Sequence, residues 1–204
     1  TSVVSKIMES IVRDKMLQHL MNNDLICQQQ HGFIPNKSCN TNLLETIDFL
    51  TNESKSGDSI DVIYLDFSKA FDKVSHDKII VKLKSLGFGN VIVNWIDAFL
   101  RDRMQRVMIG LTASEWVQVT SGVPQCSVLG PILFVIFIND LPRNLKNACK
   151  IYADDNKLMA KVNCEEDHAQ LQRDLDTIVS WSNNWQMELN VKKCHVLHIG
   201  KRNP

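Results

Sequence analysis

Residues 150–162 read KIYADDNKLMAKV, and in them Asp154 and Asp155 stand side by side between two segments that alternate apolar and polar residues. This alternation predicts two strands joined by a tight turn, a β-hairpin. Two unpaired carboxylates about 4 Å apart repel by roughly 1–4 kcal/mol, so a chain that fixes such a pair usually holds a cation there. Because Asp and Asn also favour solvated turns, the pair alone leaves both interpretations open.

A third carboxylate would make a metal site more robust, and Asp66 is the best candidate. It closes DVIYLDF (61–67), an otherwise apolar run that reads as a strand buried on both faces. Adjacent strand residues point to opposite faces, so Asp154 and Asp155 could approach one metal only if the chain turns between them. The alternative for Asp66 is a helix N-cap after the strand.

The composition is that of a globular protein with a sizeable core. The chain has 204 residues, of which 44% are hydrophobic and 23% charged, and its formal net charge is zero. This balance gives no overall signal for nucleic acid, although an acidic centre can offset a basic groove. The longest apolar run, PILFVIFI (131–138), is too short to span a bilayer.

The cysteine pattern predicts reduced thiols and no structural metal. None of the six cysteines forms a C-x-x-C pair, so neither a zinc ribbon nor a redox motif is expected. Cys194 and His198 could share a metal, but no second pair completes such a site.

The rest of the chain mixes helices and strands, which favours an α+β fold. Helical spacing of apolar residues predicts helices over about 4–21, 41–54, 75–88, 91–100, 131–141 and 171–185. Strand patterns predict a hairpin within 105–119 and a last short strand at 194–199.

Three motifs resemble the palm motifs of reverse transcriptases, in that family's order and approximate spacing. They are VIYLDFSKAFDKVSHDKI (62–79), SGVPQCSVLGPILFVIFINDLP (121–142) and KIYADDNKL (150–158). Residues 1–20, HGFIPNKSCNTNLL (31–44) and WQMELNVKKCHVLHIG (185–200) also resemble non-LTR retrotransposon polymerases, most closely the jockey-like group. The resemblance covers almost the whole chain.

The resemblance implies a right-hand polymerase palm, an antiparallel sheet with packed helices, plus partial helical fingers and no thumb. Residues 1–60 would be partial fingers, and residues 61–204 the palm with a fingers-like insertion at about 73–120. The missing fingers and thumb segments, and an endonuclease, would belong to a parent polyprotein. That parent would act inside the cell, in the nucleus, and not on a membrane.

The implied activity is RNA-templated DNA synthesis with an RNA template, a DNA primer and dNTPs. The primer 3′ oxygen attacks the α-phosphate of a nucleotide, and two Mg²⁺ ions, or Mn²⁺ in their place, stabilise the attacking and leaving oxygens. By resemblance, Asp66 and Asp154 are the principal metal ligands and Asp155 supports them. The backbone carbonyl of Phe67 would also contact the nucleotide-side metal.

The resemblance also implies a set of nucleotide-binding residues. Ala70 and Phe71 lie beside the nucleotide, and the Phe71 ring is the steric gate that excludes a ribose 2′-hydroxyl; its alternative is a core phenylalanine. Gln125 would touch the incoming nucleotide from a loop that includes Cys126.

Two lysines complete the expected site. Lys37 lies where relatives usually carry an arginine that holds the triphosphate, although Lys lacks the bidentate fork and could be an exposed loop residue. Lys193 resembles the lysine proposed to protonate pyrophosphate. Its neighbour Lys192 could be confused with it, and both could line a solvated strand edge.

The chain departs from the family pattern at a few positions. The usual PQG reads PQC, so Cys126 replaces a glycine, and a positive φ there would cost roughly 1–2 kcal/mol. Ser75 replaces a common proline, and Asn156 and Lys157 replace the usual continuation after ADD.

Two other functions remain open at this point. The first is a catalytically inactive relic, or a domesticated RNA-binding module, on the same fold. The second is an acidic phosphoacceptor or another Mg²⁺ phosphotransferase, which would not explain Gln125 and Phe71. A basic cluster of Arg101, Arg103 and Arg106 could contact template phosphates, but a solvated face is favoured.

Overall fold

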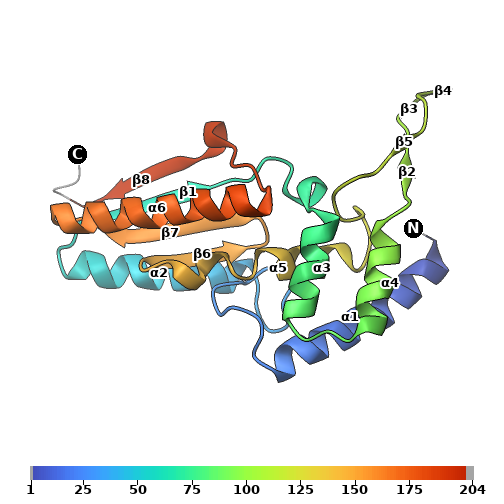
Figure 1. Cartoon of the computed structure of the whole chain (residues 1–204). Coiled ribbons are helices and arrows are strands. Elements are labelled where there is room, and N and C mark those ends of the chain that lie inside the picture. Colours follow the sequence, from blue (N-terminus) through green and yellow to red (C-terminus); the bar gives the residue numbers. More distant parts are fainter. Residues whose placement is uncertain (1, 201–204) are drawn as a thin grey trace. The chain divides into compact units, whose positions relative to one another are not determined.

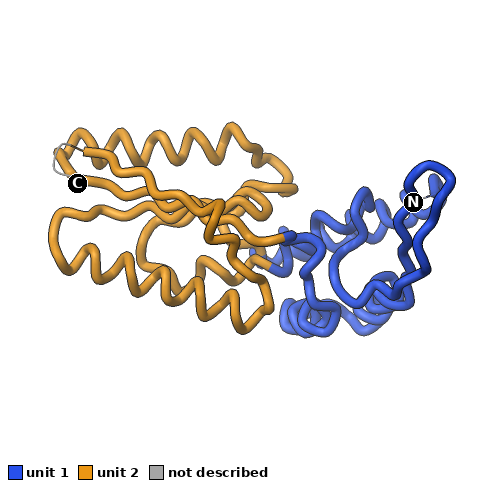
Figure 2. The backbone as a smooth tube through the Cα atoms, turned by 90° about the horizontal axis from the view of Figure 1, so that it is seen from above, with its two compact units in different colours: residues 1–25, 69–137 blue, residues 26–68, 138–204 orange. Residues whose placement is uncertain are grey.

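A computed structural model describes residues 2–200 and divides the chain into two compact units (Figure 2). Unit 1 comprises residues 1–25 and 69–137, and unit 2 comprises residues 26–68 and 138–204. Each unit is therefore built from two separate stretches of sequence. The assignment of residues 1–60 to fingers and 61–204 to palm stays a prediction, because compactness alone identifies neither.

Unit 2 contains a four-stranded antiparallel sheet in the order β6-β7-β1-β8. The central strand β1 pairs with β7 so that Leu65 lies opposite Asn156. The predicted hairpin, the buried strand and the last strand are all confirmed. The strands are β1 (Ile60–Leu65), β6 (Ala148–Tyr152), β7 (Asp155–Lys161) and β8 (His195–Ile199).

Two long helices, α2 (Cys39–Lys55) and α6 (Glu165–Trp185), cover opposite faces of this sheet (Figures 1 and 2). Alternate strand residues point to opposite faces, and Ile60, Val62 and Met159 form a core with Phe49 and Leu50 of α2. Short 3₁₀ helices η2 (Leu141–Asn144) and η3 (Val191–Lys193) flank β6 and β8.

Unit 1 is helical around the buried helix α5 (Gly130–Ile138), whose side chains at Leu133, Phe134 and Phe137 are inaccessible to solvent. The sequence predicted that α5 would run to about Leu141, but it ends at Ile138. Pro142 has no N–H to donate to the carbonyl of Ile138, four residues earlier, and its ring crowds that carbonyl, so the α-helix ends there. The other helices are α1 (Val3–Asn22), η1 (Ala70–Lys73), α3 (His76–Ser85) and α4 (Asn90–Leu100).

The hairpin predicted in unit 1 is present but is broken into short ladders. β2 (Met104–Gln105) pairs with β5 (Val117–Gln118), and β3 (Met108–Ile109) pairs with β4 (Thr112–Ala113). All four strands are exposed, so no packed core extends the pairing. No helix within residues 2–200 is long and apolar enough to cross a membrane.

Candidate active site

The adjacent aspartates lie in the turn between β6 and β7. Tyr152 pairs with Asp155, which leaves Ala153 and Asp154 as the two central residues. Ala153 has a φ of 55°, the sign that a type II′ turn requires at its first central residue. The turn breaks the strand alternation that would separate the carboxylates, and leaves Asp154 half-buried and Asp155 exposed.

Asp66 follows the last residue of β1 at the same end of the sheet. Because β1 and β7 are antiparallel neighbours with Leu65 opposite Asn156, Asp66 lies next to the start of β7. The backbone N–H of Asn190 donates to the carbonyl oxygen of Asp66 at 2.8 Å. The carboxylate oxygen Oδ1 of Asp66 is buried and has no hydrogen-bond partner among residues 2–200. A buried carboxylate oxygen without a hydrogen-bond donor is unfavourable, and a bound cation would compensate for it.

The three carboxylates influence one another electrostatically. Burial raises the pKa of Asp154 above its ordinary value, and the negative charges of Asp155 and Asp66 raise it further. A cation would relieve this repulsion, so the residues fit a divalent metal. As the side chains lie, no three His, Cys, Asp or Glu residues within 2–200 form a closed metal-binding group. Metal ligation by the three aspartates therefore stays a prediction.

Lys193 lies beside this carboxylate group, whereas no ion pair is recorded for Lys192 in the described part of the chain. The ammonium of Lys193 is 3.6 Å from Oδ2 of Asp66. Lys193, Asp66 and Asp155 line one cavity of about 340 Å³, together with Tyr64, Tyr152 and Lys157. This volume is within the range of small-molecule pockets.

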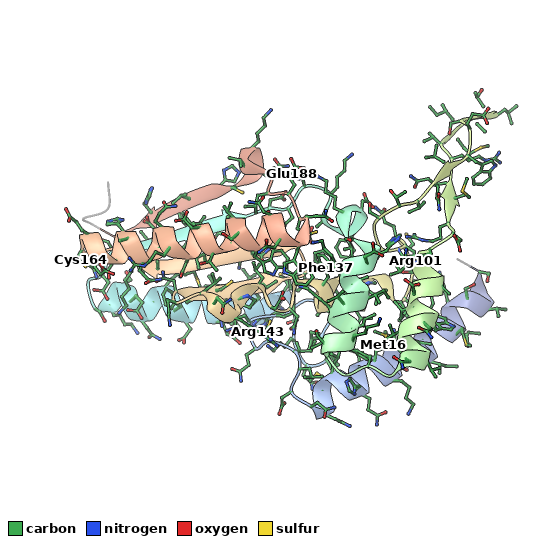
Figure 3. All side chains as sticks on the ribbon, viewed as in Figure 1. Met16, Arg101, Phe137, Arg143, Cys164 and Glu188 are labelled. Atoms are coloured by element: carbon green, nitrogen blue, oxygen red, sulfur yellow. The ribbon has the colours of Figure 1, made fainter. Side chains whose placement is uncertain are left out.

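Phe67 is fixed by packing immediately after Asp66. Its side chain is buried, and its ring centroid lies 5.9 Å from that of Trp181 on α6. The next residue, Ser68, donates its N–H to the carbonyl of Glu188 at 2.8 Å, and Figure 3 labels Glu188 after the end of α6. The backbone around Phe67 is thus held at both sides. Metal contact by its carbonyl stays a prediction.

Lys37 is placed differently from the other predicted residues of unit 2. Its ammonium donates to the carbonyl of Gln28, and its charged neighbours include Glu45 and Lys150. Burial lowers the pKa of Lys37. Its recorded contacts do not include any of the three aspartates, so the structure does not bring Lys37 to the carboxylate group.

The remaining nucleotide-binding candidates, Ala70, Phe71, Gln125 and Cys126, belong to unit 1. Ala70 is buried in η1, and the Phe71 ring stacks on Phe134 with centroids 4.3 Å apart and an interplanar angle of 18°. The Phe71 side chain is half-buried. It therefore contributes to the core of unit 1, and its role as a steric gate stays a prediction.

The glutamine loop is attached to η1 within unit 1. Gln125 donates from Nε2 to Oδ1 of Asp72 at 2.8 Å. Gly122 has a φ of 88°, and a Cβ there would lie 2.7 Å from the carbonyl oxygen of Asp72. Both Gln125 and Asp72 line a cavity of about 580 Å³ with Lys69 and Arg103.

Cys126 has the left-handed backbone that its replacement of a glycine suggested. Its φ is 60°, and the residue is exposed. The condition under which the replacement of glycine would be costly is therefore met. The left-handed conformation costs an L-residue roughly 1–2 kcal/mol, so the backbone next to Gln125 is strained by about that amount.

Glu9 supports the same loop and has no sequence motif that reveals it. It is buried on α1, and its Oε2 accepts from the backbone N–H groups of Val128 and Leu129 at 2.7 and 3.2 Å. An acidic residue in an amphipathic helix usually faces water. The sequence signal was only that Glu9 interrupts the apolar helical pattern.

The three arginines of the basic cluster have separate partners. Arg101, labelled in Figure 3, pairs with Asp77 at 2.6 Å and Asp97 at 2.7 Å. Arg103 donates to the carbonyl of Gly122 at 2.6 Å, and Arg106 lies 4.6 Å from the ring centroid of Trp116. The structure does not present them as one basic surface.

Comparisons with solved structures confirm the predicted fold class. Telomerase from Candida tropicalis, solved with the TWJ fragment of telomeric RNA, superposes with a TM-score of 0.71 over 98% of this chain and 34% of that one, at 12% identity. The form of that telomerase truncated from its C-terminal domain gives a TM-score of 0.70 over 93% of this chain and 40% of that chain, at 13% identity. The identities are low, so these matches show the fold alone.

Curated relatives confirm the expected similarity to the jockey-like group. The RNA-directed DNA polymerase from mobile element jockey of Drosophila melanogaster is 28% identical over 94% of this chain. The probable RNA-directed DNA polymerase from transposon BS of the same fly is 28% identical over 94% of the chain. The chain spans 22% of the length of each relative.

The family model described as reverse transcriptase (RNA-dependent DNA polymerase) matches residues 1–203. This match covers all three palm-like motifs, both units and every predicted site residue. The chain therefore belongs to the reverse transcriptase family.

Proposed function

We propose that this chain is the catalytic region of an RNA-directed DNA polymerase that extends a DNA primer on an RNA template during retrotransposon replication. The observation that carries the proposal is the convergence of Asp66 with the Asp154–Asp155 turn at the ends of neighbouring strands. The names of the jockey and BS relatives support the same activity. We place the parent element in the nucleus as part of the same proposal.

The carboxylate group is suited to divalent metals. When bound, two Mg²⁺ ions, or Mn²⁺, would stabilise the attacking and leaving oxygens of the displacement. Asp66 and Asp154 would hold them, with Asp155 in support. The unpartnered Oδ1 of Asp66 and the raised pKa of Asp154 are what carboxylates awaiting a cation would have.

The other predicted residues would bind the nucleotide or donate a proton to the leaving group. The ammonium of Lys193, next to Asp66, would donate a proton to the departing pyrophosphate. The Phe71 ring would exclude a 2′-hydroxyl, and the Gln125 amide, oriented by its bond to Asp72, would contact the nucleotide. Lys37 would reach a triphosphate only by leaving the carbonyl of Gln28.

Primer extension tests this proposal directly. The chain, expressed with the flanking segments of its parent, should extend a DNA primer on an RNA template with dNTPs and Mg²⁺. Asp154→Asn should reduce the rate at least about 1,000-fold, equal to about 4 kcal/mol of transition-state stabilisation. Asp48→Asn, on the exposed surface of α2, is the matched control and should retain the rate.

A second candidate function is an inactive relic, or a domesticated RNA-binding module, on the same fold. The strained Cys126 backbone next to Gln125 favours it. This candidate predicts RNA binding without primer extension, and extension that Asp154→Asn abolishes would rule it out.

A further inference from the structure

The segment that contains Gln30 lies beside the edge strand β6, close to the point where β6 enters the Ala153–Asp154 turn. The Ile151 N–H donates to the carbonyl of Gln29, and the His31 N–H donates to the carbonyl of Ile151, both at 2.9 Å. Gln30 thus forms a parallel bridge with Ile151, and its side chain is inaccessible to solvent. The sequence places Gln30 about 120 residues from this turn, so no local pattern reveals the contact.

The side-chain oxygen of Gln30 joins two backbone donors. Oε1 accepts from the N–H of Gly32 at 2.7 Å and from the N–H of Ala153 at 3.0 Å. Both partners are donors, so only the amide oxygen can face them, which fixes the orientation of the amide. The other amide atom, Nε2, is buried and has no hydrogen-bond partner in the part of the chain that the structure describes. Both hydrogen bonds of the Gln30 side chain, to Gly32 and to Ala153, are therefore made by its oxygen.

The contact requires glycine at position 32. A Cβ on Gly32 would lie 2.5 Å from the backbone nitrogen of Ala153, closer than real Cβ contacts. Backbone atoms cannot move aside as a flexible side chain can. Gly32 therefore lets the segment approach the turn closely enough for Gln30 to bind it.

Ala153 is the residue of the turn that most needs this support. It is buried, and its φ of 55° is unfavourable for a residue with a Cβ. Strained backbone persists where its surroundings over-determine it. A second residue of the turn, Asp154, follows directly, so the orientation of Ala153 sets where the Asp154 carboxylate points.

We propose that Gln30 is a positioning residue that holds the Ala153–Asp154 turn, and through it the Asp154 carboxylate, in the geometry that metal binding needs. This role rests on the proposed polymerase function. Gln30 touches neither substrate nor metal, and acts only through the backbone N–H of Ala153.

Three variants separate positioning from general stability. Gln30→Met keeps the approximate size of the side chain but removes the acceptor. Gln30→Glu keeps an acceptor oxygen and replaces only the unpartnered Nε2. Gln28→Met makes the same chemical change on an exposed neighbour and is the matched control.

Amide hydrogen exchange is the first measurement, because it does not depend on activity. In Gln30→Met, the Ala153 amide should exchange at least about tenfold faster, while the amides of the β1–β7 ladder keep their rates. Gln30→Glu and Gln28→Met should keep the protection seen in the native chain. Unchanged exchange at Ala153, or equal acceleration throughout the ladder, would overturn the proposal.

Metal binding and kinetics connect the turn to function. In Gln30→Met, the dissociation constant for Mn²⁺, measured by electron paramagnetic resonance, should rise at least about threefold, and kcat for primer extension should fall about tenfold without a change in KM for dNTP. Gln30→Glu should restore both. If the native chain extends no primer, the proposed function fails, and exchange and Mn²⁺ affinity still decide the positioning role. Faster exchange at Ala153 with unchanged Mn²⁺ affinity would overturn that role.

Discussion

Cys126 carries a backbone conformation that suits glycine, so a single substitution should relieve it. Cys126→Gly removes a cost of roughly 1–2 kcal/mol but adds unfolded-state entropy of roughly 0.5–1 kcal/mol. We expect a net gain of about 0.5–1 kcal/mol in the free energy of unfolding, measured by urea denaturation.

Cys126→Ala is the control for this prediction. Alanine keeps a Cβ at the φ of 60° and removes only the thiol. It should therefore gain no stability. An equal gain from Ala and Gly would show that the side chain, and not the backbone, is the source of the strain.

Asp154 should cost stability in the absence of metal. Its folded-state pKa is raised by burial and by Asp155 and Asp66, so the folded chain binds this proton more tightly than the unfolded chain does. The stability linked to it is fully present below the ordinary pKa of about 3.8 and is lost as pH rises through the raised folded value.

Asp154→Asn should therefore raise the melting temperature at pH 7 in metal-free buffer and flatten its fall between about pH 4 and 7. A gain on the order of 1 kcal/mol is reasonable for relief of one carboxylate repulsion. Thermal denaturation across this pH range measures it, with Asp48→Asn as control. A loss of stability would show that Asp154 is held by favourable contacts instead.

Phe71 should serve both the core and nucleotide selection. Phe71→Ala removes the stack on Phe134 and should lower the free energy of unfolding by about 2 kcal/mol, less than a fully buried Phe. If the ring is also the gate, ribonucleotide incorporation relative to deoxynucleotide should rise at least about tenfold.

The matched control is Phe99→Ala, which removes another half-buried ring, stacked on Trp95 at 5.5 Å. It should lose similar stability and keep the native preference for deoxynucleotides. Equal ribonucleotide use in both variants would leave Phe71 with a packing role only.

At the scale of single residues, the sequence predicted which charged residues belong to the site better than it predicted their side-chain contacts. The resemblance implied that Asp66 and Asp154 share one site, and the register confirms that the strands next to them, β1 and β7, are neighbours. Lys37 was expected near a triphosphate, yet its ammonium binds the carbonyl of Gln28. A lysine side chain has several rotatable bonds, so a loop motif does not determine where its ammonium lies.

Among the elements, the attachment of the glutamine loop to η1 makes the clearest prediction. Gly122→Ala would bring a Cβ within 2.7–2.9 Å of three backbone atoms of Asp72, at a φ of 88°. We expect a loss of about 3 kcal/mol or more in the free energy of unfolding, because backbone cannot give way cheaply. Urea denaturation measures it.

Gly110→Ala is the matched control for that loss. Gly110 also has a positive φ, 60°, but a Cβ there would meet nothing within 4 Å. Its substitution should cost only about 1 kcal/mol, the price of the backbone conformation. Equal losses at both positions would show that the approach to Asp72 contributes nothing.

Elements with a strong apolar pattern were predicted well, and those without one were not. The sheet strands and the long helices overlap the segments that periodicity predicted. In α1 and α2, however, apolar residues of the predicted helical face, such as Ile7, Leu44 and Ile47, are exposed. The exposed hairpin broke into four short strands, since no core rewards a continuous ladder. The end of α5 depended on Pro142, a local effect that the pattern of apolar residues hides.

At the scale of the molecule, the resemblance implied an insertion at about 73–120, but no sequence pattern predicted that residues 1–25 and 69–137 would form one compact unit. The motifs follow one another along the chain, whereas unit 2 joins residues 26–68 to residues 138–204. Contacts such as Gln30 with Ala153 depend on this long-range joining. Periodicity and spacing report neighbours along the chain. The resemblance identified the aspartates, but neither it nor these patterns predicted the residues that hold them.

The most direct test of the account is RNA-templated primer extension by the native chain with its flanking segments, compared with Cys126→Gly and Asp154→Asn. The account predicts Mg²⁺-dependent incorporation of deoxynucleotides by the native chain, a rate at least as high in Cys126→Gly, and none in Asp154→Asn. Extension that survives Asp154→Asn, or its absence in both the native chain and Cys126→Gly, would contradict the assignment of Asp66, Asp154 and Asp155 as a polymerase active site.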